Sequence, residues 1–263
     1  MMKILLPASV LPTLILMSCQ KEITGDKEIQ QQCRIVKGVY TLSGGSSDSA
    51  QFIYDDWGNV VKCKTAIGHY DYLYEGSNIN VLTFKNNSAS DLLMLDSIRY
   101  DEYNAISEIS FYDYTELPFN LKHHRTIFIY DNYIIRGLMK ITYVKGQPDT
   151  SIINFTWNAD GNVQKMTCSD MAGGVIENVT YQYNTMPNYF KTIHPMFFLF
   201  DPKFGMNDEF ESRIPLYYSR NNVIQLNQNG TNQNLTYYFD SKNRFTGVNL
   251  GSSQSVSYSY QCQ

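Results

Sequence analysis

The stretch FIYDDWGNVVKC, Phe52 to Cys63, carries the pattern from which the rest of the fold is predicted. An aromatic residue, Tyr54, is followed by aspartates, by Gly58-Asn59, and then by apolar residues at alternate positions. An Asp side chain at the end of a strand can accept hydrogen bonds from backbone amides two residues on, and Gly or Asn tolerates the positive φ of a narrow turn. Because side chains alternate across a strand, the stretch predicts a β-hairpin with one apolar face.

Variants of this pattern recur along the whole chain. They start at Tyr54, Tyr74, Tyr100, Tyr130, Trp157, Tyr183, Tyr218 and Phe239. Their mean spacing of about 26 residues corresponds to two strands and two turns, which predicts a repeated hairpin unit. We therefore expect an all-β fold: a long antiparallel meander of about 14 to 16 strands, closed or nearly closed into a barrel-like sheet.

The register of the pattern predicts which side chains share the apolar face. Positions at odd offsets from the aromatic residue are apolar, and the positions between them are polar. The apolar positions, which we expect to share one face of the sheet, are Cys63, Ile109, Phe111, Met139, Ile141, Met166, Cys168, Val248 and Leu250. The unit at Tyr74 differs, because Leu82 lies at an even offset, and we expect its turn to be one residue longer. In the last segment, Ser255 to Cys262, the alternation predicts one dry and one wet face.

The N-terminal segment predicts export and a lipid anchor. An apolar run from Ile4 to Met17 is too short to span a bilayer comfortably and is typical of a secretory signal. The sequence Leu16-Met17-Ser18-Cys19 resembles the lipobox of bacterial lipoproteins, which implies cleavage before Cys19 and its acylation. The alternative is an ordinary signal peptide with a chance cysteine. The predicted organisation is a signal peptide (1–18), a lipid-anchored flexible tether (19–32) and one β domain (33–263).

One irregular, proline-rich insertion, residues 187–215, interrupts the meander. Its prolines exclude a regular central strand. It also holds the densest apolar cluster of the mature chain: Phe197, Phe198, Phe200 and Phe204. Two interpretations follow: the segment caps the apolar face of the sheet, or these phenylalanines line or gate a ligand cavity.

Composition and motifs exclude several functions. The chain has 21 basic and 25 acidic residues and no basic stripe, so we expect no nucleic-acid partner. The histidines and cysteines match no metal-ligand spacing, and no nucleophile, P-loop or dinucleotide motif occurs. The pair Asp55-Asp56 belongs to the turn pattern. We therefore expect no catalytic residue, no metal, no cofactor and no enzyme activity.

The combined features resemble an uncharacterised family of exported lipoproteins from Gram-negative gut-type bacteria. The features are the lipobox at Cys19, the Tyr-Asp-x-x-Gly-Asn turn at Tyr54 to Asn59, and the proline-bearing apolar insertion. That family is described as a domain of unknown function with a porin-like fold. The hairpins also look like the tyrosine–aspartate repeats of bacterial surface and toxin-shell proteins. The resemblance covers the chain from about Gln32 onward and implies fold and compartment, with no catalytic residues to transfer.

Barrel closure bears on the cysteines and on the membrane. Several strands are too short for a membrane-spanning barrel, so the apolar face should point inward rather than form a pore. With an even number of strands, the first and last are neighbours, which makes Cys33 and Cys262 a candidate disulfide. Cys63 and Cys168 are expected to be buried thiols.

These inferences support a lipid-anchored protein of the bacterial cell envelope, at the outer membrane, on either its periplasmic or its surface face. Its expected role is to bind a glycan, a peptide, an apolar molecule or a partner protein. A structural or assembly component of the envelope is the alternative.

Overall fold

The computed structural model describes residues 33–41, 47–87, 91–114, 122–144, 147–189, 214–216, 218–251 and 255–262. These residues form a single antiparallel sheet of 17 strands, and the predicted all-β meander is confirmed, with one strand more than the expected range. The strands are β1 (Cys33–Thr41), β2 (Ser47–Tyr54), β3 (Val60–Lys64), β4 (Gly68–Glu75), β5 (Asn78–Asn86), β6 (Leu92–Tyr100), β7 (Ile106–Asp113), β8 (Lys122–Asp131), β9 (Ile134–Val144), β10 (Gln147–Trp157), β11 (Val163–Asp170), β12 (Val175–Pro187), β13 (Asn221–Gln228), β14 (Thr231–Asn234), β15 (Thr236–Phe239), β16 (Phe245–Asn249) and β17 (Ser255–Cys262).

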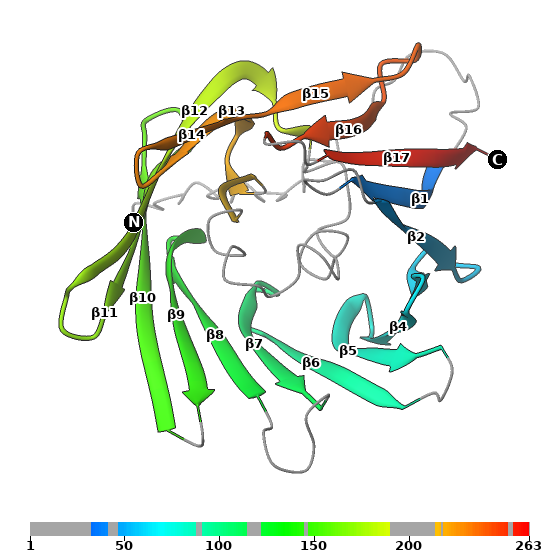
Figure 1. The fold of residues 1–263 in the computed structure, drawn as a ribbon, viewed down its shortest axis with the longest axis horizontal. Coiled ribbons are helices and arrows are strands. Elements are labelled where there is room, and N and C mark those ends of the chain that lie inside the picture. The colour runs from blue at the N-terminus through cyan, green and yellow to red at the C-terminus, as the bar shows by residue number, and fades with distance from the viewer. Residues whose placement is uncertain are drawn as a thin grey trace, which may run out of the picture.

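The sheet curls into a nearly closed barrel. β1 pairs with β2 on one side and with β17 on the other, so the two ends of the meander meet, blue beside red in Figure 1. One seam remains along residues 231–239: among the described residues, β14 has register pairs only with β13, and β15 only with β16. Only Leu235 separates these two strands, and its N–H donates to the Ile224 carbonyl at 2.8 Å. The seam therefore lies where the chain passes from one neighbouring strand to the other.

The apolar core lies inside the ring. Of the side chains predicted to face it, Cys63, Ile109, Met166 and Val248 are all at most 2% exposed. A short helical turn at 214–216, gold in Figure 1, also lies inside the ring, where Ile214 and Leu216 are buried. The part of the insertion that contains Phe197, Phe198, Phe200 and Phe204 lies outside the described residues.

The register predicted after Tyr130 and the turn length predicted after Tyr74 were wrong, and both follow from a shorter turn. Tyr100 pairs with Ile106, six residues on, whereas Tyr130 pairs with Ile135 and Tyr74 with Ile79, five residues on. The turn after Tyr74 is therefore one residue shorter, not longer. After Tyr130 the turn is shorter by the same one residue. Because side chains alternate across a strand, this shift exchanges the inward-facing and outward-facing positions of β9. Leu138, paired with the buried Phe128 and Ile153, is fully buried, and the predicted core residue Met139 lies on the opposite face.

The longer turns share one hydrogen-bonding arrangement. In the first, the Asp55 carboxylate accepts from the backbone N–H groups of Trp57 (3.0 Å) and Asn59 (2.8 Å), and Gly58 has φ +92°. The turns that begin at Asp101, Asn158 and Asp240 repeat this geometry, with Asn104, Gly161 and Asn243 at the positive-φ position. The acidic or amide residue and the Gly or Asn thus have the roles that the sequence predicted.

These turns, together with Cys33 and Cys262, lie at one end of the barrel, which we call the turn rim. Eight aromatic side chains, the rim aromatics, each donate a hydrogen bond of 2.5 to 3.1 Å to a backbone carbonyl of the neighbouring strand. They are Tyr54, Tyr74, Tyr100, Tyr130, Trp157, Tyr183, Tyr237 and Tyr260.

Each rim aromatic makes its hydrogen bond just beyond the last backbone register pair between two neighbouring strands. Gln51 makes the last register pair between β2 and β1, with Lys37; three residues later Tyr54 donates instead to Ile35, two residues before Lys37. All eight sites have these same two offsets. A carbonyl that the splayed ladder would leave unpaired is thereby satisfied by a side chain, which stabilises the rim.

Candidate functional site

The structure places only part of the predicted site residues. Cys19 lies outside the described residues, as do the four phenylalanines of the insertion. Cys33 and Cys262 form a disulfide, and Cys63 and Cys168 are free thiols. Burial raises the pKa of the Cys63 thiol to about 12, partly offset by a hydrogen bond with Tyr72, which makes this thiol unreactive at neutral pH.

An open cleft of about 720 Å³ lies at the turn rim, between β11 and β12. Two irregularities produce it. The β11–β12 ladder ends at Lys165 and Thr180, so the two strands separate toward the rim. β12 then bulges, because Tyr183 pairs with Val223 and Pro187 with Asn221, leaving the segment 184–186 opposite a single residue of β13.

A network of buried polar groups holds the walls of the cleft. Asn162 and Asn221 bond each other twice, from the Asn221 N–H at 2.8 Å and from the Asn162 amide at 3.0 Å. The Ser219 hydroxyl contacts the Val163 N–H and the Tyr183 hydroxyl. The buried Asn188 amide donates to the carbonyls of Leu216 (2.7 Å) and Ser219 (2.8 Å). The ends of the insertion are thus fixed directly beside the cleft, and such satisfied networks make a site rigid.

The lining of the cleft is polar. It includes the amides Asn158, Asn162, Gln164, Gln182, Asn184 and Asn221, with Asp160, Arg220 and the tyrosines Tyr181 and Tyr183. Several of the asparagines are used in the walls, whereas the side chains of Gln164, Gln182 and Arg220 are exposed on the cleft without a protein hydrogen bond in the described part of the chain. Those three side chains come from β11, β12 and the segment before β13, and they are available to a ligand.

A second hollow of about 440 Å³ lies at the same rim between β1 and β2. Two of its three charged groups have structural partners: Asp55 closes its own turn, and the Arg34 guanidinium lies over the Tyr54 ring, 5.5 Å from its centroid. Fewer polar groups are therefore available there, and the cleft at β11–β12 is the better candidate.

Other chemistry is sparse in the described ranges. No three His, Cys, Asp or Glu side chains come together as a metal site there. Burial raises the pKa of the Asp96 carboxyl, inside the barrel, to about 8, and its Oδ1 has no hydrogen-bond partner among the residues that the structure describes. None of the described helices is long and apolar enough to be a transmembrane span.

The sequence pattern did not locate the cleft. Its residues come from three segments that span 158 to 221, and the pattern placed them in separate hairpin units that start at Trp157, Tyr183 and Tyr218. Tyr218, predicted to start a hairpin, instead follows the helical turn at 214–216. The degenerate pattern at Tyr183 and Tyr218 was the one available signal, because it marks where the regular hairpin order stops.

Comparison with solved structures supports the fold. The chain is similar to a porin-like protein from Bacteroides vulgatus, with a TM-score of 0.54, 12% identity, and coverage of 86% of this chain and 98% of the other. It is equally similar to a porin-like protein from Bacteroides uniformis, with a TM-score of 0.54, 9% identity and the same coverage. No family model and no curated protein matches the sequence. The shared feature is therefore the porin-like barrel itself.

Proposed function

We propose that this protein is a lipid-anchored barrel of the bacterial cell envelope that binds a hydroxyl-rich ligand, an oligosaccharide, in the cleft between β11 and β12. The observation that carries the proposal is the lining of that cleft: primary amides and an arginine on a rigid frame, beside two tyrosines. The predicted lipobox at Cys19 and the porin-like neighbours from Bacteroides support the envelope location.

The chemistry of the lining favours a sugar over other ligands. Most small-molecule pockets are largely apolar, with volumes of about 300 to 1,000 Å³; this cleft has such a volume but a polar wall. A primary amide offers both donors and an acceptor, which matches hydroxyl groups that also donate and accept. Arg220 adds one positive charge and Asp160 one negative charge, so the net charge of the lining is zero and does not favour a strongly charged ligand. An uncharged oligosaccharide meets these requirements best.

The outer surface argues against a membrane-spanning pore. A row of cross-strand neighbours runs from β17 through β5 on the outward face: Ser259, Lys37, Gln51, Lys64, His69 and Lys85. A spanning barrel needs an apolar band on this face, and lysine at the bilayer midplane costs about 2 to 4 kcal/mol per residue. The barrel is therefore proposed to stand in water, held to the membrane by its lipid.

The anchor has a direct test. Replacing Cys19 with alanine removes the only thiol that the predicted signal peptidase and acyl transfer would use, so the protein should move from the membrane fraction to the water-soluble fraction of fractionated cells. Metabolic labelling with a fatty-acid probe should mark the wild-type protein and not Cys19→Ala. Membrane retention of an unlabelled Cys19→Ala protein would reject the lipid anchor.

The cleft is tested separately with purified protein and an array of bacterial and host glycans. We expect binding that falls at least about tenfold in Gln164→Ala and in Gln182→Ala, because each change removes a hydrogen-bonding amide without touching the wall network. Gln51→Ala is the matched control: it is also an exposed glutamine on the outer face of a strand, but outside the cleft, and should bind as wild type. An array without any bound glycan would support the structural or assembly role instead.

A further inference from the structure

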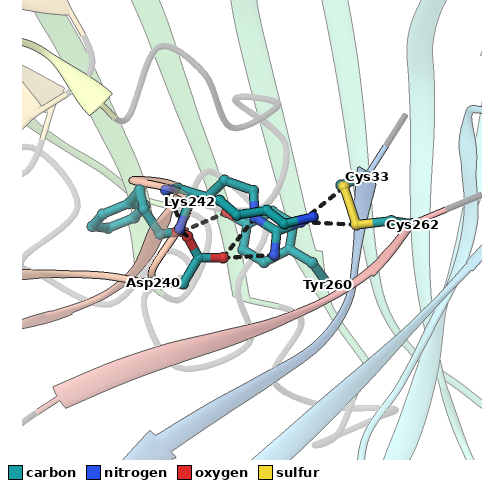
Figure 2. Close-up of polar contacts among 7 residues, drawn as sticks. Cys33, Asp240, Lys242, Tyr260 and Cys262 are labelled. Atoms are coloured by element: carbon teal, nitrogen blue, oxygen red, sulfur yellow. Dashed lines mark hydrogen bonds and ion pairs between the residues drawn. A yellow bond between two sulfur atoms is a disulfide. The ribbon is translucent and has the colours of Figure 1, made fainter. Parts of the chain in front are cut away.

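The Cys33–Cys262 disulfide has an unusual neighbour. The guanidinium group of Arg244, the last residue of the 240–244 turn, places one N–H nitrogen 2.8 Å from each of the two sulfur atoms. Figure 2 shows the bonds that connect the disulfide, through this arginine, with Asp240. Both cysteines are only partly buried, and they lie on the turn rim, at the ends of β1 and β17.

The position of Arg244 is fixed from several sides. Its Nε donates to the Asp240 carboxylate at 2.6 Å, and its carbon centre lies 5.3 Å from the Tyr260 ring centroid. The Asp240 carboxylate accepts hydrogen bonds from the Lys242 and Arg244 backbone N–H groups at 2.9 Å. These bonds keep the pKa of Asp240 below its ordinary value, and the bond from the Arg244 N–H has the largest effect. The arginine is therefore held at the sulfurs by a carboxylate that stays ionised near neutral pH.

We propose that Cys33–Cys262 is a thiol–disulfide exchange site for a dithiol reductant, with Arg244 stabilising the departing thiolate. A thiolate of the dithiol attacks one sulfur, the S–S bond breaks, and its electron pair leaves on the other cysteine. Since Arg244 contacts both sulfurs equally, either cysteine can be the leaving group. A positive charge lowers the pKa of a leaving thiol, and a thiol of lower pKa leaves faster.

The second half of the exchange balances the reaction. The remaining thiol of the reductant loses its proton and attacks the mixed disulfide, so that the reductant is oxidised to its own disulfide and both cysteines are reduced. The two protons of the dithiol end on Cys33 and Cys262. The seven other register pairs of β1 with β17 remain to hold the sheet, so the exchange releases the rim without separating the strands.

Two variants test the assignment. Arg244→Gln should slow reduction of the folded protein by dithiothreitol about threefold to tenfold, because the leaving thiolate loses its charged donor. Asp240→Asn should slow it as well, because the amide NH2 that replaces Oδ2 cannot accept from the Arg244 Nε–H, and the guanidinium is then no longer held at the sulfurs. Asn is compatible with this turn position, since Asn158 makes the same backbone contacts in the equivalent turn.

The readout is alkylation of each cysteine, measured by peptide mass spectrometry on the full chain. Cys63, which is 1% exposed, is the internal reporter of unfolding: only rates measured while it stays unmodified count. Loss of stability would speed reduction, so a slower Arg244→Gln variant cannot be explained by unfolding. Reduction of Arg244→Gln at the wild-type rate or faster, with Cys63 protected, would overturn the proposal and show that the arginine is structural or shields the bond.

Discussion

Replacing Cys33 and Cys262 together with serine is expected to lower the free energy of unfolding by about 3 to 5 kcal/mol. The two cysteines are 229 residues apart in sequence, so the bond closes a loop of nearly the whole described domain. In the chain-entropy account, the stabilisation grows with the logarithm of loop length and reaches roughly 5 kcal/mol for a loop of this size. For a domain of this length, the change corresponds to a melting temperature lower by about 6 to 20 °C.

Thermal unfolding with and without reductant provides the measurement and its control. Reductant should lower the melting temperature of the wild-type protein to that of the double variant, and should leave the double variant unchanged. The double variant avoids a single unpaired thiol at the rim. Equal melting temperatures of the oxidised wild-type protein and the double variant would contradict the prediction and would assign barrel closure to the β1–β17 ladder alone.

The rim aromatics predict a steep alkaline transition. Burial raises the pKa of every rim tyrosine above its ordinary value, to about 12 for Tyr74. The folded protein thus keeps these protons at a pH at which the unfolded chain releases them. The resulting stability is complete below the unfolded pKa of about 10 and is lost as the pH rises above it.

The size of the effect follows from the number of groups. Each tyrosine that ionises only in the unfolded chain removes about 1.4 kcal/mol per pH unit, so the rim tyrosines together remove several kcal/mol per unit. A domain of ordinary stability, about 5 to 15 kcal/mol, should then unfold near pH 11. We expect tyrosinate absorbance and loss of β-sheet circular dichroism to change together in one step. A gradual rise in absorbance with the sheet intact beyond pH 12 would contradict this account.

The turns were the most predictable feature, because their chemistry is local. The Asp55 carboxylate, the positive φ of Gly58 and the alternation after them all act within about six residues, so the sequence pattern contains the whole interaction. The same logic predicted the Asp101, Asn158 and Asp240 turns. It failed at Tyr130, where Asn132 and Tyr133 both have positive φ and close a tighter turn that moves Met139 out of the core.

For most hydrogen bonds of the rim aromatics, the sequence pattern pointed to the donor but not to the acceptor. The aromatic residue before each turn was noted, but its partner carbonyl lies 14 to 24 residues earlier, on the neighbouring strand. Near the C-terminus the pattern pointed to Phe239, which lacks a hydroxyl; Tyr237 makes the bond instead. The turn pattern could not point to Tyr260, because Tyr260 lies near the end of the last strand and no turn follows it.

By itself, the sequence determined the all-β class, the antiparallel hairpins, the chemistry of the longer turns and most of the inward-facing residues. Each of these depends on neighbours along the chain, through side-chain alternation and turn geometry. The tertiary structure alone decided where the ring retains a seam, where β11 and β12 separate to form the cleft, and that Arg244 meets both sulfurs of the disulfide. Those contacts join segments up to 211 residues apart, and their geometry follows from the combined twist and register of every strand between them.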